Sequence, residues 1–348
     1  MADYQTRDFD YELPSELIAR YPLPDRTASR MLWVDKAHQS LHDQEFRSLL
    51  DHLRPEDLLV FNDTKVIPAR LYGFKASGGQ LECLVERILG PHRVLAHLRA
   101  SKAPKPGSLI HLNSLEVRVI GRQNDLFELE FLASKPVLEL LQEFGEIPLP
   151  HYMDRQPDDL DQQRYQTVFA RREGAVAAPT AALHFDQEFL EAVKTKGIEI
   201  AYLTLHVGSG TFQPVRTESL AEHVMHTEVM DLSAETCEAI QRCKARGGRV
   251  IAVGTTVVRT LESAALKGEL EPYQGETNIF IYPGFEFKVV DALVTNFHLP
   301  KSTLMMLVCA FGGYELMMKA YQHAVAEKYR FFSYGDSMLI MGSGLSIV

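Results

Sequence analysis

Four groups of polar side chains follow apolar runs with the character of strands, and these groups are the candidates for chemistry. The first is "FNDTKVIPARL", in which residues 62–65 come directly after the apolar run "LLVF" and Arg70 follows. Open α/β sheets bind ligands at the carboxyl ends of their strands, so this density of polar groups favours a site. Asn and Asp also suit turns, and Asp63 taken alone fits a capped crossover about equally well.

The second group, "RYQTVFARREGAVAAPTAALHF", holds the densest basic stretch of an acidic chain. Its basic and aromatic members are Arg164, Tyr165, Phe169, Arg171 and Arg172. Arginines interleaved with aromatic rings suit phosphate contacts and base stacking, although a surface helix with i,i+4 ion pairs also explains them. The following segment has small, apolar side chains apart from Thr180 and His184, which predicts a binding-site wall that a ligand can approach closely.

The third group joins "LHVGSGTF" to "EHVMHTEVM". Two glycines separated by one residue after a strand are typical of a dinucleotide-binding turn, but Gln213 and Pro214 stand where its next glycine and its helix belong. Without that helix no N-terminal dipole faces an anion, so the phosphate interpretation is weak. Gly208 and Gly210 still allow the backbone to approach an uncharged ligand closely.

Histidines in this third group raise the question of a metal site. His206, His223, His226 and Glu228 are residue types that bind zinc, but their spacing matches no HExxH motif. A histidine that acts as an acid or a base is better supported, because the ordinary pKa of the imidazole lies near neutrality. We therefore expect no metal site.

The fourth group, "VGTTVVRTLES", reads as a strand, Gly254 and a helix that begins with Thr255 and Thr256. The free N–H groups of a helix N-terminus bind anions, and the carboxylate of an amino-acid moiety is a suitable occupant. Two capping threonines are the alternative interpretation. Downstream, "TNIFIYPGF" and "LVTNFHLPKST" add Asn296, His298 and several aromatic rings, which in such numbers are more often core than binding platform.

Length, composition and charge bound the class of protein. A chain of 348 residues, 46% hydrophobic and 24% charged, is long enough for two domains. The start "MADYQTRDFDYELP" lacks the apolar stretch of a secretory signal. The longest apolar run is too short to span a bilayer. The four cysteines are scattered along the chain, which predicts reduced thiols. We expect a cytoplasmic protein without membrane contact. A net charge of -10 argues against general nucleic-acid binding but permits a local basic patch.

The elements that must position these groups change in character along the chain. Two strands of the buried type, "RMLWV" and "DLLVF", come first, and a helix is expected over 42–53. Six short runs with turn signals between them occupy 69–132, which predicts a small antiparallel barrel, and "KPVLELLQEFG" predicts a helix that ends at Gly145. From about residue 150, strands alternate with helices, two of which Asp186 and Ser233 are expected to cap.

The predicted fold class is therefore α/β, a mostly parallel sheet sandwiched by helices, with an inserted small antiparallel β-barrel. We expect residues 1–64 plus 150–348 to form one discontinuous α/β catalytic domain. Residues 65–149 are expected to form the inserted barrel domain.

Seven motifs together closely resemble the S-adenosylmethionine:tRNA ribosyltransferase-isomerase family. They are "FNDTKVIPARL", "YQTVFA", "AAPTAALHF", "LHVGSGTF", "VGTTVVRTLES", "TNIFIYPGF" and "LVTNFHLPKSTLMMLVCAFGG", in order across nearly the whole chain. The resemblance implies an α/β domain with an inserted barrel. It also implies transfer and isomerisation of the ribosyl part of S-adenosylmethionine onto 7-aminomethyl-7-deazaguanine at the wobble position of tRNAs with GUN anticodons. The implied products are epoxyqueuosine in tRNA, adenine and methionine.

The implied reaction needs no prosthetic group, since S-adenosylmethionine is a co-substrate and the RNA base brings its own amine nucleophile. A base must deprotonate the ribose carbon beside the sulfonium, and adenine needs a proton to leave. His206 and His226 are the first candidates for these proton transfers, followed by Asp63 and His184. Lys65, Arg70, Arg164, Arg171 and Arg172 are expected to line the path of the anticodon. The other expected substrate-binding residues are Asn62, Thr64, Tyr165, Thr180, Gly208, Ser209, Gly210, Phe212, Gly254, Thr255, Thr256, Asn296 and His298.

Two other classes of protein share part of this pattern. A methyltransferase would use the same donor but release S-adenosylhomocysteine in place of adenine and methionine. A non-catalytic RNA-binding module would use the barrel but would not need polar groups at the strand ends. We expect the chain to act as a monomer.

Overall fold

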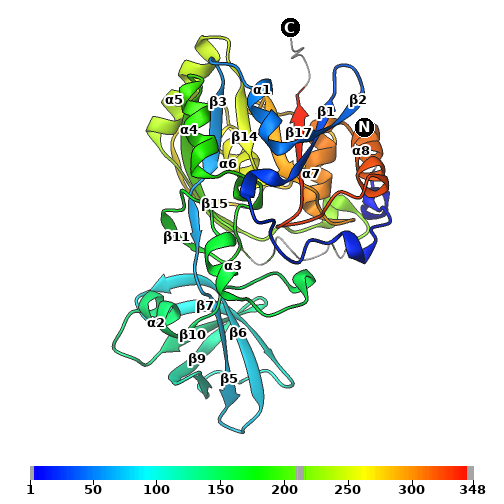
Figure 1. Cartoon of the computed structure of the whole chain (residues 1–348). Coiled ribbons are helices and arrows are strands. Elements are labelled where there is room, and N and C mark those ends of the chain that lie inside the picture. The colour runs from blue at the N-terminus through cyan, green and yellow to red at the C-terminus, as the bar shows by residue number, and fades with distance from the viewer. Residues whose placement is uncertain (1–3, 209, 211–214, 216, 343–348) are drawn as a thin grey trace.

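A nine-stranded sheet covered by helices and a separate barrel make up the computed structural model, which describes residues 4–208, 210, 215 and 217–342 (Figure 1). The strand order of the sheet is β15-β13-β12-β3-β14-β16-β17-β1-β2. In that order the strands span Tyr273–Thr277, Glu228–Leu232, Glu199–His206, Leu58–Asn62, Val250–Val253, Ala292–Asn296, Ser337–Met341, Arg30–Asp35 and Ser40–Glu45.

The sheet is mixed, which corrects the expectation of a mostly parallel one. The four central strands β12, β3, β14 and β16 run parallel to one another, and β17 runs parallel to β1. The pairs β12·β13, β13·β15, β16·β17 and β1·β2 are antiparallel. The alternation of strands and helices after residue 150 predicted the parallel centre correctly, but it did not distinguish the antiparallel strands that extend the sheet on both sides.

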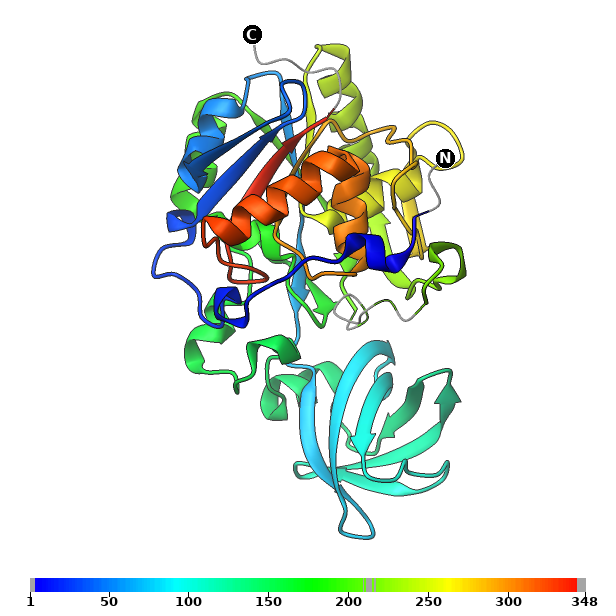
Figure 2. The ribbon, with the colours of Figure 1, turned by 90° about the vertical axis from the view of Figure 1, so that its right-hand side faces the viewer.

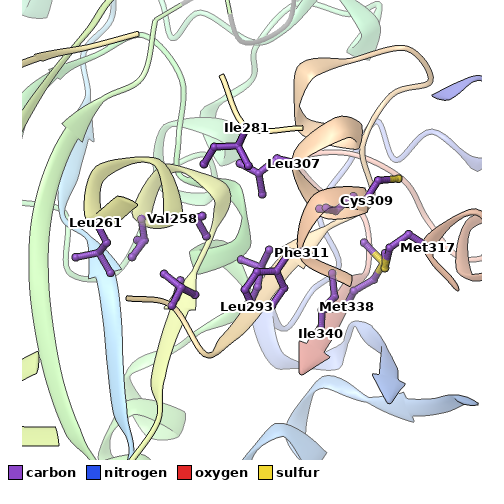
Figure 3. Close-up of a cluster of buried hydrophobic side chains, with 14 of the residues drawn as sticks. Val258, Leu261, Ile281, Leu293, Leu307, Cys309, Phe311, Met317, Met338 and Ile340 are labelled. Carbon is purple, nitrogen blue, oxygen red and sulfur yellow. The ribbon is translucent and has the colours of Figure 1, made fainter. Parts of the chain in front are cut away.

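Helices cover both faces of the sheet, because the central strands have apolar side chains on both sides. In β3, Leu58 and Val60 pack into one core and Leu59 and Phe61 into the other. Figure 3 shows part of the first core, which includes Val258, Leu293 and Phe311. The helices of this part are α1 (Leu49–His52), α4 (Gln187–Thr195), α5 (Ala234–Ala245), α6 (Thr255–Ala264), α7 (Thr303–Gly312) and α8 (Tyr314–Ala326).

Hydrogen bonds at the helix starts match the caps that the sequence predicted. The Asp186 side chain accepts from the Phe189 N–H, and the Ser233 hydroxyl accepts from the Thr236 N–H. In the described part of the chain, none of the helices alone has the length and hydropathy needed to cross a membrane, and α7 and α8 meet that test only as a pair bent by 117°.

The helix expected over 42–53 is wrong over 42–45, and the rest of the segment is helical only as a 3-10 turn at Phe46–Ser48 followed by α1. The segment begins within the edge strand β2, and α1 is a single turn at Leu49–His52. Strand β2 pairs with β1 along its whole length, from Arg30 opposite Glu45 to Asp35 opposite Ser40. Its polar sequence reflects its edge position, where charged side chains face solvent and discourage pairing with another chain.

The six runs predicted between 69 and 132 are strands, and they close into a barrel of order β10-β7-β6-β5-β8-β9. They are β5 (Arg70–Lys75), β6 (Gln80–Gly90), β7 (Arg93–Ala100), β8 (Leu109–Leu112), β9 (Leu115–Gln123) and β10 (Leu126–Phe131), and α2 (Val137–Phe144) packs against them. Figure 2 shows the barrel below one end of the α/β part. A parallel ribbon of β4 (Thr64–Val66) and β11 (Arg172–Ala175) lies at the junction, as does α3 (Asp159–Arg164). The domain boundaries at 64/65 and 149/150 stay a prediction.

Candidate active site

A pocket lies where the parallel strands β14 and β16 end and where α6 and α7 begin. We call it the central pocket, and it encloses about 60 Å³. The sequence-predicted residues that line it are Thr180, Gly254, Thr255, Thr256, Asn296 and His298. These residues come from two of the four polar groups, the second and the fourth with its downstream segments, and Val207 of the third group also lines the pocket.

The start of α6 forms one side of this pocket. Gly254 has a φ of 101°, a conformation that glycine adopts without strain, and its N–H donates to the Val294 carbonyl of the neighbouring strand. This turn sends β14 directly into α6, whose first N–H groups have no intrahelical acceptor. Thr255 and Thr256 carry those N–H groups and line the pocket. A carboxylate is stabilised at such a helix start.

Two buried polar atoms in the central pocket have no hydrogen-bond partner among the described residues. They are Thr256 Oγ1 and Asn296 Oδ1, in residues that are 6% and 2% exposed. Buried polar groups in folded proteins are nearly always paired, so such orphans indicate a place for a ligand or a water molecule. The hydroxyl can donate a hydrogen bond and the amide oxygen can accept one.

His184 explains why the Asn296 oxygen is the unpartnered atom. The Asn296 amide nitrogen donates to the Phe332 carbonyl at 2.9 Å and lies 3.3 Å from His184 Nε2. His184 Nδ1 lies 2.7 Å from the Ser29 hydroxyl, and burial lowers the pKa of His184 to about 3. His184 is therefore a neutral, buried side chain that orients Asn296 and does not itself line the pocket.

His298 lines the central pocket as an uncharged group. Its Nε2 lies 2.9 Å from the Thr295 hydroxyl, and its backbone N–H donates to the Tyr321 hydroxyl at 3.0 Å. Burial lowers the pKa of His298 to about 3, so the imidazole carries no charge near neutral pH. His298 therefore contributes no positive charge to the pocket.

A second pocket of about 250 Å³ adjoins the central pocket at Leu304, and we call it the turn pocket. It contains Gly208, Gly210, His223, His226, Glu228 and Arg259. The Gly208 N–H donates to Glu228 Oε1 at 3.2 Å, and Arg259 donates to the other carboxylate oxygen. Arg259 belongs to α6, so the same helix forms one wall of the central pocket and holds the glycine turn through a buried ion pair.

The two glycines of the turn are sites of close approach. A Cβ at Gly210 would lie 2.3 Å from the His226 ring, and a Cβ at Gly208 would lie 2.4 Å from Glu86 Oε1 of barrel strand β6. The missing side chains therefore let an imidazole and a barrel carboxylate pack against the turn. Ser209 and Phe212, also predicted as site residues, lie outside the described residues.

Asp63 and His206 lie in a different environment. The Asp63 carboxylate accepts from the Arg171 guanidinium at 2.9 Å and from the Thr204 hydroxyl at 2.6 Å, while His206 Nδ1 lies 2.8 Å from the Thr64 hydroxyl. Burial lowers the pKa of His206, and Asp63 opposes that shift. Asp63 lines a groove of about 600 Å³ beside β12, which we call the Asp63 groove, and the described residues lining it do not line the central pocket.

Three of the predicted basic residues, Lys65, Arg171 and Arg172, lie together at the β4·β11 ribbon, and Arg70 and Arg164 lie elsewhere. Lys65 pairs with Glu173 and Arg172 with Asp231, both as partly exposed ion pairs. Arg164 donates to the Pro24 carbonyl. Arg171 and Arg172 line the Asp63 groove, whereas Arg70 is buried at the start of barrel strand β5.

Two further predicted residues have structural contacts. Tyr165 is 1% exposed and packs edge-on against Tyr334, so its ring is part of the core. Asn62 joins β3 to β12, because its amide nitrogen donates to the Leu205 carbonyl and its amide oxygen accepts from the Leu205 N–H. Among the described residues no group of three or more His, Cys, Asp or Glu side chains is placed to hold a metal ion.

Comparisons with known proteins show the family of the chain. The family described as "Queuosine biosynthesis protein" matches residues 6–340, and the chain belongs to this family. Proteins named S-adenosylmethionine:tRNA ribosyltransferase-isomerase from two strains of Coxiella burnetii, Dugway 5J108-111 and CbuK_Q154, are each 60% identical to it over 338 residues. These alignments cover 97% of the chain and 98% of each relative.

A solved structure is similar as well. The crystal structure of an S-adenosylmethionine tRNA ribosyltransferase from Thermotoga maritima matches with a TM-score of 0.57 and 38% sequence identity. The match covers 96% of this chain and all of that one. The family resemblance of the seven motifs is thus confirmed over nearly the full length.

Proposed function

We propose that the chain is an S-adenosylmethionine:tRNA ribosyltransferase-isomerase. It transfers and isomerises the ribosyl moiety of S-adenosylmethionine onto 7-aminomethyl-7-deazaguanine at the wobble position of tRNAs with GUN anticodons. The products are epoxyqueuosine in tRNA, adenine and methionine. The observation that carries the proposal is the central pocket, where two unpartnered polar atoms and a helix start suit an amino-acid head group, in a chain of this family.

The amino-acid end of the donor fits the central pocket by charge and by hydrogen bonding. Its carboxylate binds at the start of α6, where the Thr256 hydroxyl donates to it. Its ammonium donates to Asn296 Oδ1, the acceptor that His184 leaves turned toward the pocket. The central pocket is too small for the whole donor, so the nucleoside extends past Leu304 into the turn pocket.

The turn pocket supplies the proton-transfer group. Of the four candidates, His226 is the one that the described residues place in the wall of this pocket. We assign to His226 the proton transfers at the ribose carbon beside the sulfonium and at the departing adenine, and to His184 the orientation of Asn296. Glu228 and Arg259 hold the turn against which the nucleoside packs. The chain acts as a cytoplasmic monomer in this proposal.

Product analysis tests the proposed function. The chain is incubated with S-adenosylmethionine, labelled in the ribose, and with tRNA that carries the precursor base, and the products are identified by mass spectrometry. Free adenine, free methionine and label in the tRNA support the proposal. S-adenosylhomocysteine would instead identify a methyltransferase, and tRNA binding without any product would identify a binding module.

A matched histidine pair tests the assignment of His226. His226→Ala is expected to slow single-turnover ribosyl transfer by about a hundredfold or more, the usual contribution of a general acid or base. His111→Ala changes an exposed histidine on barrel strand β8 and is expected to leave that rate unchanged. Equal rates for the two variants would refute the assignment.

A further inference from the structure

A third cavity, of about 580 Å³, lies between the barrel and residues 148–152, and we call it the barrel-side cavity. It shares Tyr152 and Leu299 with the central pocket and Asp125 with the turn pocket. Its volume lies within the range of sites that bind small molecules. A second substrate therefore has room directly beside the proposed donor site.

The lining of the barrel-side cavity is positive, although the chain as a whole carries a net charge of -10. Arg70, Arg99 and Arg122 line it together with two histidines. Arg70 pairs with Glu82 and Arg122 with Asp125, so the excess positive charge comes from Arg99. The Arg122 guanidinium lies 5.2 Å from the centre of the buried Phe127 ring, which also lines the cavity. Cations beside aromatic rings suit a phosphate and a flat base.

Glu82 presents a fixed carboxylate to this cavity. Strand pairing sets Tyr72 and Arg99 directly opposite Glu82 on its two neighbouring strands. Arg70 Nε lies 3.1 Å from Glu82 Oε1, and Arg70 also donates to the Leu149 carbonyl, so the ion pair is anchored on both sides of the junction. The Glu82 side chain is 20% exposed. A carboxylate has about four acceptor positions, so a ligand can donate to it beside Arg70.

We propose that the barrel-side cavity receives the wobble base after it leaves the anticodon stack, and that Glu82 binds its guanine-like N1–H and N2–H edge. This inference rests on the proposed function. Enzymes that act on a base extrude it into a pocket and read its Watson–Crick edge by hydrogen bonds. Two neighbouring N–H donors on one edge match the two oxygens of a carboxylate.

The orientation that follows brings the nucleophile to the donor. In 7-aminomethyl-7-deazaguanine the aminomethyl group lies on the opposite side of the ring system from the N1 and N2 edge. With that edge at Glu82, the proposal places the amine at the part of the lining formed by Tyr152 and Leu299. Those two residues also line the central pocket, so the amine faces the proposed donor site.

The test compares two RNA hairpins with the anticodon-loop sequence. One carries 7-aminomethyl-7-deazaguanine, and the other carries the analogue without the 2-amino group. We expect the wild-type chain to prefer the first by about tenfold or more in kcat/KM, the discrimination that a bidentate base contact provides. In Glu82→Gln that preference falls toward one, while the KM for S-adenosylmethionine stays unchanged.

Two further variants keep the test decisive. Glu130→Gln is the matched control, because Glu130 is a barrel carboxylate, 26% exposed, that pairs with Arg118 away from the cavity. It should keep the wild-type preference. Arg99→Gln changes an exposed residue at the cavity, so it tests the assignment even if Glu82→Gln does not fold. It should raise the KM for RNA and reduce the salt dependence of RNA binding by about one counterion.

Adenine release separates the two proposals. If the wild-type chain releases adenine but Glu82→Gln and Arg99→Gln both behave like Glu130→Gln, the assignment of the barrel-side cavity is overturned and the proposed function stands. If the wild-type chain releases no adenine from either hairpin or from full-length tRNA, the proposed function fails, and the cavity assignment fails with it.

Discussion

Thr256→Val separates a ligand-binding hydroxyl from a structural one. The substitution keeps the shape of the side chain and removes an Oγ1 atom that is buried without a partner. A buried, unpaired hydroxyl costs about 1 to 3 kcal/mol, so its removal should leave the free energy of unfolding of the ligand-free chain unchanged or higher. The same hydroxyl donates to a carboxylate in our proposal, and hydrogen bonds to charged groups contribute about 1.5 to 3 kcal/mol. The Kd for S-adenosylmethionine should therefore rise by about tenfold to a hundredfold.

Thr260→Val is the matched control, one turn further along α6. The Thr260 hydroxyl is fully buried but donates to the Thr256 carbonyl at 2.9 Å. Its loss removes a made hydrogen bond, so we expect a loss of about 1 kcal/mol in unfolding free energy and an unchanged Kd for the donor.

The two assays are direct. Isothermal titration with S-adenosylmethionine gives Kd, and urea denaturation gives the unfolding free energy. Trp33 is the single tryptophan of the chain and lies in β1 of the nine-stranded sheet, so its fluorescence reports on the unfolding of that part and not of the barrel. A Thr256→Val chain that is less stable and binds the donor normally would refute the reasoning.

Three further predictions concern the turn pocket and the buried histidines. Glu228→Gln leaves the buried Arg259 cation without its carboxylate and should cost about 3 to 5 kcal/mol in urea denaturation; a cost below about 1 kcal/mol would contradict the buried pair. Gly210→Ala should displace the His226 ring, which lies 2.3 Å from the added Cβ position, and lower kcat more than thermal stability; normal turnover would contradict this placement. Burial holds the pKa of His298 at about 3 in the folded chain, against about 6.5 in the unfolded chain. Protonation of His298 therefore favours the unfolded chain, and the free energy of unfolding decreases as the pH falls from about 6.5 toward 3. The slope is up to about 1.4 kcal/mol per pH unit, and His298→Gln should reduce it; an unchanged slope would show that His298 is not the group responsible.

The sequence predicted the barrel and the helix starts because both have local signals. Turn residues between 69 and 132 mark the barrel strands, and Asp186 and Ser233 precede amphipathic helices as caps do. The helix expected over 42–53 failed at its first four residues, because β2 is set by its pairing with β1, a tertiary contact that the polar composition of an edge strand does not show.

The central pocket was also accessible from sequence, since its polar residues follow strands that run parallel and end at one edge of the sheet. Thr256 and Asn296 meet for this reason although forty residues separate them. Glu228 was considered as a zinc ligand and Arg259 was missed, because their ion pair joins β13 to α6 and has no sequence motif. An arginine within the apolar stretch "TTVVRTL" was the one signal that such a pair exists.

The barrel side of the site could not be predicted from local patterns. Glu82 and Glu86 belong to a strand with an ordinary alternating sequence. Closure of the barrel places Glu86 beside the glycine turn and places Glu82 in a cavity with residues 148–152. The arginines of the second polar group had a stronger signal for a binding site in the sequence. In the fold, however, Arg171 and Arg172 pair with Asp63 and Asp231 and line the Asp63 groove, which shares no described lining residue with the central pocket.

A crystal structure of the chain with S-adenosylmethionine bound is the most direct measurement of the central claim. We predict the donor carboxylate within hydrogen-bond distance of the Thr255 and Thr256 N–H groups, its ammonium at Asn296 Oδ1, and its nucleoside against Gly208 and Gly210. Donor density in the Asp63 groove, with the central pocket occupied by water, would contradict the account.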